Sequence, residues 1–313
     1  MIKFNRDILK NKIIDIHTHS VGIEMNHFRT GTYPITQNIL DLSNIILSNG
    51  IDFAVTFPMP TTVYYNYNLI YNENRFEPSG YSDYPYQYEN NALYNLILQM
   101  KIQNLIPFVS VSVQEKVKEQ IKGIYSLHEK FGVYGIKYHS NTERLSIDNS
   151  RFEPFAKLAH EMNIPILVHS EFSQYSHPDN ILRFASKHPN VRICIAHCVR
   201  FHKNVLERIN RDFENIYVDT APLVRLCKIA QNTQQQSNSL LALDFKVPLN
   251  ALQEFIEFIP KKVLWGTDVP WHHFVNDENV VTYEDEASLI KSIDIVLREQ
   301  VIKNQIRFLF GND

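Results

Sequence analysis

Eight short apolar runs rich in β-branched residues recur along this chain of 313 residues, and most are followed by an amphipathic stretch. The runs lie at 13–17, 52–57, 107–112, 134–139, 165–170, 191–197, 216–221 and 263–268. Such continuous apolar character is typical of strands buried on both faces. Alternation with helices implies parallel strands and right-handed crossovers. The pattern predicts an α/β fold, a closed (β/α)₈ TIM barrel, with an open doubly wound sheet as the alternative.

One barrel domain is expected over residues 1–313, because this length suits a barrel with insertions. Helices are predicted at 36–49, 90–104, 114–131, 151–163, 178–188, 203–214, 249–259 and 285–309. Two long rim inserts remain: 58–89 after the second strand and 222–248, partly helical, after the seventh. The stretch from Tyr64 to Tyr94 holds 9 of the 16 tyrosines, which fits either a substrate lid or an oligomer contact. A homodimer through this insert is one hypothesis.

Composition narrows the classes of partner. A net charge of −3 gives no electrostatic case for a nucleic acid. No apolar run approaches the ~20 residues that span a bilayer, so no membrane partner is expected. Three cysteines do not form a disulfide framework, and a reducing, cytoplasmic setting is expected. No glycine-rich phosphate-binding motif is present, so a small-molecule substrate without a nucleotide cofactor is the expected partner.

Unusual polar residues stand at the ends of the predicted strands, and a barrel brings all strand ends to one rim. They are His17 and His19 on the first strand, Lys137 and His139 on the fourth, and His169, His197 and Asp268 on the fifth, sixth and eighth. Residues i and i+2 share one side of a strand, so both histidines of a His-x-His pair point the same way. Imidazole and carboxylate suit Zn²⁺, Fe²⁺ or Mn²⁺. The sequence therefore predicts a metal site at this rim.

Residues near these strand ends have expected roles of their own. Arg200 either holds a substrate carboxylate bidentately or is a solvated loop arginine. Trp271 is expected to line the substrate pocket. Asp219 ends the seventh strand and is expected to orient a neighbour through a hydrogen bond. Asp15 has the opposite strand parity and is expected to be structural, and Cys198 is expected to be a packed thiol.

The segments IDIHTHS, ILVHSE, CIAHC and LWGTDVPW resemble the amidohydrolase superfamily of metal-dependent barrels. The element GTDVP and the tail NQIRFLFGN are most similar to its amidohydrolase-related branch, which includes decarboxylases similar to aminocarboxymuconate-semialdehyde decarboxylase. The resemblance implies His17, His19, His169 and Asp268 as ligands of a first metal. It implies His197 as a catalytic residue or second-metal ligand, and Asp268 also as the base acting on the metal-bound water.

Lys137 has three interpretations. In binuclear members of the superfamily, a fourth-strand lysine is carboxylated and bridges two metals. Lys137 could instead bind a substrate anion, or form a structural ion pair. His139, two residues on, is expected to share its side and to bind substrate or support Lys137. One ion is expected rather than two, with zinc ahead of manganese or iron.

The resemblance implies a metal-dependent hydrolase that cleaves an amide, lactone or ester bond of a small molecule through a metal-activated water. Non-oxidative decarboxylation is the alternative, because the same ligands serve both reactions. A non-catalytic oligomeric scaffold is the second alternative, and metal stoichiometry would distinguish it.

Overall fold

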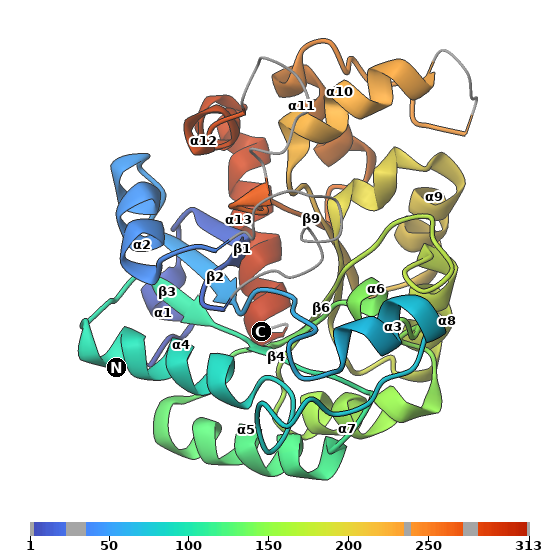
Figure 1. The fold of residues 1–313 in the computed structure, drawn as a ribbon. Coiled ribbons are helices and arrows are strands. Elements are labelled where there is room, and N and C mark those ends of the chain that lie inside the picture. The colour runs from blue at the N-terminus through green and yellow to red at the C-terminus, as the bar shows by residue number, and fades with distance from the viewer. Residues whose placement is uncertain (1–2, 23–35, 235–238, 272–280, 312–313) are drawn as a thin grey trace.

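The structure of the protein is a computed structural model that describes residues 3–22, 36–234, 239–271 and 281–311. Helices surround a ring of short parallel strands (Figure 1). The strands are β1 (Ile14–His19), β2 (Phe53–Phe57), β3 (Leu105–Pro107), β4 (Val109–Ser110), β5 (Ile136–Tyr138), β6 (Ile166–Val168), β7 (Ile193–Ile195), β8 (Ile216–Asp219) and β9 (Val263–Leu264). Each predicted apolar run contributes strand residues to this ring.

The helices alternate with these strands as the sequence predicted. They are α1 (Arg6–Leu9), α2 (Ile39–Ser48), α3 (Tyr67–Glu73), α4 (Gln87–Gln99), α5 (Val117–Phe131), α6 (Ser140–Glu143), α7 (Glu153–Glu161), α8 (Pro178–Lys187), α9 (Lys203–Asp212), α10 (Leu223–Gln234), α11 (Pro248–Phe258), α12 (Tyr283–Ser292) and α13 (Ile295–Phe310), with short turns η2 (Ser150–Phe152) and η3 (His197–Phe201). None of the described helices is both long and apolar enough to cross a bilayer.

Two sets of strands, β1–β3 and β4–β9, join into one ring. The strand predicted at 107–112 forms as β3 and β4, because the chain changes partner at Phe108. The amide of Phe108 donates to Thr56 O in β2 at 2.9 Å, and Val109 pairs with Ile136 of β5. The first strand meets the last, since Ile16 N donates to Trp265 O at 3.0 Å. These bonds form the predicted barrel rather than an open sheet.

Two layers of apolar side chains explain why the strands read as continuous apolar runs. Ile14, Ile16, Phe57 and Phe108 belong to the cluster that fills the ring. A larger cluster, including Ile136, lies between the strands and the surrounding helices. Successive residues of a strand therefore both meet apolar neighbours, one on each face.

The helix predicted at 285–309 is wrong as a single element, because the structure divides it into α12 and α13 at Ile293 and Asp294. Asp294 accepts from the amides of Val296 and Leu297, which makes it the N-cap of a new helix. The insert at 222–248 contains α10, as its partly helical assignment predicted, and residues 235–238 lie outside the described part of the chain.

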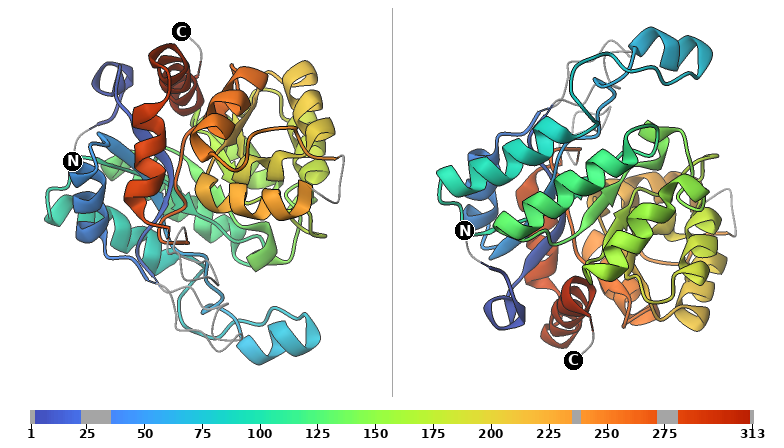
Figure 2. Two further views of the ribbon diagram at one scale, coloured as in Figure 1. Left: turned by 90° about the horizontal axis from the view of Figure 1, so that it is seen from above. Right: turned by 90° about the horizontal axis from the view of Figure 1, so that it is seen from below.

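The insert at 58–89 carries α3, which projects from the body of the barrel (Figure 2). Its base has a small core of Tyr64, Tyr65, Ile70 and Tyr86. The Arg144 guanidinium donates to the carbonyl of Ile70 at 2.7 Å and so ties the projection to the barrel. Helix α4 begins at residue 87 rather than the expected 90, so it shortens this insert.

Candidate metal centre and active site

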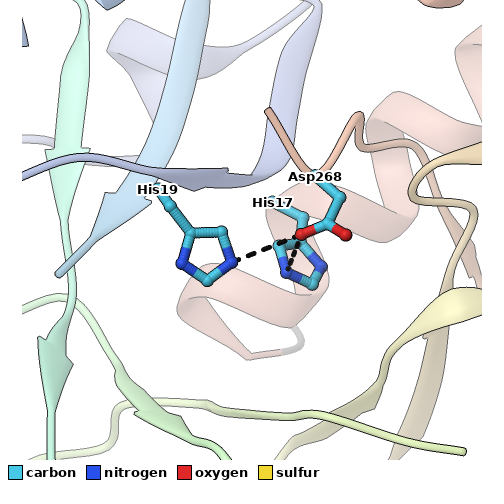
Figure 3. Close-up of side chains that lie close together, drawn as sticks. All are labelled: His17, His19 and Asp268. Carbon is cyan, nitrogen blue, oxygen red and sulfur yellow. Dashed lines mark ion pairs between the residues drawn. The ribbon is translucent and has the colours of Figure 1, made fainter. Parts of the chain in front are cut away.

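His17 and His19 from β1 meet Asp268, which follows β9, at the carboxyl end of the strands (Figure 3). Asp268 Oδ1 lies 3.3 Å from Nε2 of His17 and 3.3 Å from Nε2 of His19. All three ligand-capable atoms lie within 4.8 Å of one another. The structure thus brings together three of the four residues that the resemblance implied as ligands of a first metal.

The backbone at the end of β9 is shaped to bring Asp268 to this position. A Cβ atom on Gly266 would lie 2.9 Å from Cβ of His17, so only glycine permits this close approach. The amide of Asp268 then donates to His17 O at 2.8 Å. Asp268 itself adopts a φ of 58°, in the left-handed region that few non-glycine residues occupy.

Asp219 at the end of β8 controls the tautomer of His17. Its Oδ2 lies 2.9 Å from His17 Nδ1, and its Oδ1 accepts from the amides of His197 at 2.9 Å and Ala221 at 3.2 Å. A carboxylate that receives two amide donors accepts from the imidazole as well, so Nδ1 of His17 carries its proton. Nε2 of His17 therefore carries a lone pair, which faces Asp268. This is the orienting hydrogen bond expected of Asp219.

His197 and His169 form a second pair of rings beside this group. His197 Nδ1 lies 2.6 Å from the carbonyl of Ala221, which only accepts, so Nδ1 carries the proton. His197 Nε2 must then accept from His169 Nδ1 at 3.0 Å. His169 stacks on His139 with ring centroids 4.0 Å apart. Its Nε2 keeps a lone pair, although His169 is not among the described residues that form the group with Asp268.

Burial keeps these imidazoles neutral. It lowers the pKa of His197 to about 3. It also lowers the pKa of four further histidines well below 6.5; these are His17, His19, His139 and His169. Neutral imidazole is the form that binds a metal.

The donor set fits a cation. The lone pair of His17 Nε2 faces the carboxylate of Asp268 at 3.3 Å and the ammonium of Lys137 at 3.0 Å, so two acceptors meet at a place that already attracts a cation. Two imidazoles and a carboxylate are ligands that Zn²⁺, Mn²⁺ and Fe²⁺ accept. His17 also belongs to a second group with His197 and Asp219, whose ligand-capable atoms likewise lie within 4.8 Å of one another.

Lys137 of β5 is buried on the Nε2 side of His17, and neither residue lines the cavity over the cluster. Its Nζ lies 3.0 Å from His17 Nε2 and 4.6 Å from the centroid of the Phe57 ring. Burial lowers the pKa of Lys137 to about 8, and the nearby carboxylates of Asp268 and Asp219 partly oppose that shift. A substrate anion in the cavity would therefore meet the two arginines described below before Lys137. Carboxylation of Lys137 stays a prediction.

A cavity of about 150 Å³ opens over this cluster. Seven of the residues that line it were assigned to the site from the sequence: His19, His139, His169, His197, Arg200, Asp268 and Trp271. Four others were missed, namely Pro60, Pro222, Arg225 and Leu226. Arg225 and Leu226 lie in the first turn of α10, and recognising a helix directly after the seventh strand would have placed that turn at this rim.

A left-handed turn places Arg200 on the wall of the cavity. Residues 197–201 all have positive φ, between 50° and 68°, and none is glycine. Left-handed backbone costs non-glycine residues about 1–2 kcal/mol each. Cys198, Val199 and Phe201 of this turn are buried, which holds the strained backbone in place. The burial of Cys198 agrees with its predicted role as a packed thiol.

Asp15 and Trp271 each contact the cluster, Asp15 through the amide of His17 and Trp271 through the ring of His19. Asp15 is buried below it and accepts from Thr267 Oγ1 at 2.6 Å and Tyr283 OH at 3.1 Å, which is the structural role expected of it. The ring of Trp271 meets His19 edge-on, with centroids 4.3 Å apart. The carbonyl of Trp271 accepts from Arg225 at 3.2 Å.

Comparison with known protein families identifies the family of this chain. The model of the amidohydrolase family matches residues 14–282. The chain belongs to the amidohydrolase family. It is accordingly an enzyme of the amidohydrolase superfamily, whose members depend on a divalent metal, in agreement with the ligand groups described above. A comparison with curated proteins gives no significant match.

Solved structures share this fold at low sequence identity. A probable 2-pyrone-4,6-dicarboxylic acid hydrolase from Acinetobacter baumannii has a TM-score of 0.58 and 16% identity, over 96% of this chain and 100% of that one. A 2,6-dihydroxybenzoate decarboxylase from Rhizobium has a TM-score of 0.62 and 12% identity, over 96% and 98%. A 5-carboxyvanillate decarboxylase from Novosphingobium aromaticivorans, complexed with manganese, has a TM-score of 0.56 and 13% identity, over 95% and 96%. At these identities the likeness establishes the fold alone.

Proposed function

We propose that this amidohydrolase hydrolyses an amide, lactone or ester bond of a small molecule that carries a carboxylate. The observation that carries the proposal is the convergence of His17 Nε2, His19 Nε2 and Asp268 Oδ1 beside a cavity that His19 and Asp268 line. His169, on the same cavity, is proposed as the fourth ligand. When bound there, a divalent cation polarises a carbonyl and lowers the pKa of a coordinated water.

The residues of the chain supply the remaining parts of such a reaction. Asp268 is the carboxylate at the cavity floor, so we assign it to accept a proton from water and return it to the leaving group. His197 is held neutral with its Nε2 as an acceptor, which suits a base or a ligand better than an oxyanion donor. Trp271 forms an apolar wall that excludes water on the side of His19.

Two arginines support a carboxylate-bearing substrate. Arg200 and Arg225 both line the cavity, and a planar guanidinium binds a carboxylate bidentately. The nearest acidic partner of Arg200, Glu171 Oε2, is 4.0 Å away, so the guanidinium remains available to a second anion. The hydrolase from Acinetobacter baumannii is named for a dicarboxylic acid, which agrees with this substrate class.

Decarboxylation is a second candidate, and it is favoured by the likeness to the Rhizobium decarboxylase at a TM-score of 0.62. The same arginines and cation site would hold the substrate, and an acid in the site would deliver a proton to the carbon that loses CO₂. The two reactions differ in their products. Hydrolysis places an oxygen from water in the product acid, whereas decarboxylation releases CO₂.

Metal content per chain, measured by elemental mass spectrometry after loading with Zn²⁺, Mn²⁺ or Fe²⁺, tests the proposal. We propose one ion, so wild type, Lys137→Ala and the surface control His160→Gln should each hold one equivalent. His19→Ala and Asp268→Asn should hold much less. Equal metal in all five proteins would refute the site, and a second equivalent that is lost in Lys137→Ala would point to a carbamate bridge.

The reaction is then assigned with isotope-labelled water. The metal-loaded enzyme is incubated in H₂¹⁸O with a panel of aryl lactones and esters, and separately with hydroxybenzoates. We expect one ¹⁸O atom in the product acid and no turnover by Asp268→Asn. Release of CO₂ from the hydroxybenzoates without turnover of the lactones and esters would favour the decarboxylase instead.

A further inference from the structure

A second cavity, of about 360 Å³, adjoins the catalytic one. It lies between the left-handed turn η3 and helix α10, and both cavities are lined by Arg200 and Leu226. Its remaining wall is mainly apolar, formed by residues such as Phe172, Phe201, Ile229 and Leu240. Besides Arg200, the only titratable side chain among the described residues of this wall is His202. The second cavity therefore suits an uncharged apolar group.

Its wall is fixed by backbone hydrogen bonds. The amide of Leu241 donates to Phe201 O at 2.9 Å, and the amide of Lys203 donates to Ser239 O at 2.9 Å. These bonds join the chain after α10 to the turn that carries Arg200. Two large apolar side chains at the cavity are nevertheless open to solvent: Phe172 is 44% exposed and Ile229 is 43% exposed. A formed apolar surface that stays solvated is typical of a ligand site.

The volume of the catalytic cavity indicates that the two cavities bind one ligand together. The catalytic cavity, at about 150 Å³, has the volume of the engineered cavity that binds a single benzene ring. Pockets for small-molecule ligands usually measure about 300–1,000 Å³, a range that the catalytic cavity alone does not reach. We propose that the second cavity binds an apolar extension of the substrate whose reacting end occupies the catalytic cavity. This inference rests on the proposed function.

Helix α10 forms a wall common to both cavities. Arg225 and Leu226 face the catalytic cavity, while Ile229 and Thr233 reach the second one. At 1.5 Å rise per residue, the path from residue 225 to residue 233 is about 12 Å long. That length suits a molecule of two linked rings lying along the helix.

Arg200 stands at the junction of the two cavities. Its side chain is 34% exposed, and the ion pair that it forms within the described part of the chain, with Glu171, is long at 4.0 Å. A guanidinium binds a carboxylate with its edge and stacks on an aromatic ring with its face. Arg200 is thus a specificity-determining residue that meets the head of the substrate and the extension at once.

Calorimetry on the metal-loaded protein tests this with two probes, benzoate and biphenyl-4-carboxylate. The decisive variant is Ile229→Glu, which places a charge in the apolar wall at a solvent-exposed position. The matched control is Asn232→Glu, which adds the same charge to an exposed position of α10 that does not line the second cavity. The extension should be recognised only where its wall stays apolar.

We expect wild type and Asn232→Glu to bind the biphenyl acid at least tenfold more tightly than benzoate. Ile229→Glu should lose most of that difference and keep its affinity for benzoate. Equal affinities for the two probes in wild type, a preference that survives Ile229→Glu, or no binding of the biphenyl acid would overturn the inference. Failure of the proposed function would instead appear in the metal content and in the ¹⁸O incorporation, which are measured independently of the affinities for these probes.

Discussion

Replacing Asp219 with asparagine tests whether the tautomer of His17 governs metal binding. The amide oxygen of the introduced asparagine would still accept from the amides of His197 and Ala221, because Asp219 Oδ1 does so now. Its NH₂ group would take the place of Asp219 Oδ2, which now lies 2.9 Å from His17 Nδ1, and would donate to that nitrogen. The imidazole would accept there and carry its proton on Nε2, which points at Asp268 Oδ1 at 3.3 Å.

One substitution therefore disables two ligands. His17 loses the lone pair that a metal needs, and its new N–H occupies the carboxylate of Asp268. Changes to such outer partners typically lower metal affinity 10–100-fold, which is about 1.4–2.7 kcal/mol. Because two ligands are affected here, we expect a loss at the upper end of that range. Affinity is measured by competition with a fluorescent chelator, well below the melting temperature of each variant.

The matched control is Asp52→Asn. Asp52 accepts from the amide of Ile13 at 2.9 Å and makes no contact with a proposed ligand. It should keep the metal affinity of wild type. The reasoning is refuted if folded Asp219→Asn binds metal within threefold of wild type, because the hydrogen bond to Nδ1 would then not select the tautomer. It is equally refuted if Asp52→Asn loses as much affinity.

Three further predictions follow from burial and packing. Five buried histidines, His197 among them, have a pKa below the usual 6.5, so the unfolded chain binds protons there that the folded chain does not. Each of these histidines should therefore lower the free energy of unfolding of the metal-free protein as the pH drops below 6.5, by up to ~1.4 kcal/mol per pH unit, whereas four buried carboxyls with raised pKa values, Asp15, Glu89, Glu143 and Glu286, act in the opposite direction. The urea midpoint of His139→Gln should therefore decrease less between pH 7 and 5 than that of wild type, and an identical pH dependence of the two proteins would contradict this. Gly266→Ala should cost about 1–3 kcal/mol in urea unfolding and lower metal content, because its Cβ would press on Cβ of His17 at 2.9 Å. If the tyrosine-rich insert forms a homodimer, Tyr81→Asp with Tyr88→Asp should give monomers by light scattering, because these side chains are 47% and 51% exposed; an unchanged mass would remove the insert from the interface.

The fold could be predicted because its strands are buried on both faces. That burial leaves apolar runs that stand out from the amphipathic helices around them, and alternation then permits few topologies. The meeting of His17, His19 and Asp268 followed from the same argument, since parallel strands of a barrel end at one rim. Sequence separation was no obstacle, because the topology supplied the proximity.

Other features had no comparable signal. The break between α12 and α13 depends on one capping carboxylate, Asp294, inside a segment that keeps helical periodicity. The assignment of Arg225 to the cavity required the start of α10, which lies in a segment whose apolar spacing is interrupted by polar residues. Lys137 was placed on the correct side of the correct strand, but only the structure shows that its Nζ lies 3.0 Å from His17 Nε2.

The left-handed turn at 197–201 shows most clearly why the positions of some side chains could not be predicted from the sequence. Positive φ is usually signalled by glycine, and this turn has none. Tertiary contacts hold it instead: Val199 and Phe201 are buried, and the amide of His197 donates to Asp219 at 2.9 Å. The strain thus lies between His197 and Arg200, the two residues whose placement the cavity requires. Asp268, at a φ of 58°, also combines left-handed backbone with a place on the cavity wall. Backbone strain at residues that face the cavity, offset by core packing around them, is the pattern expected of a rigid, preorganised active site.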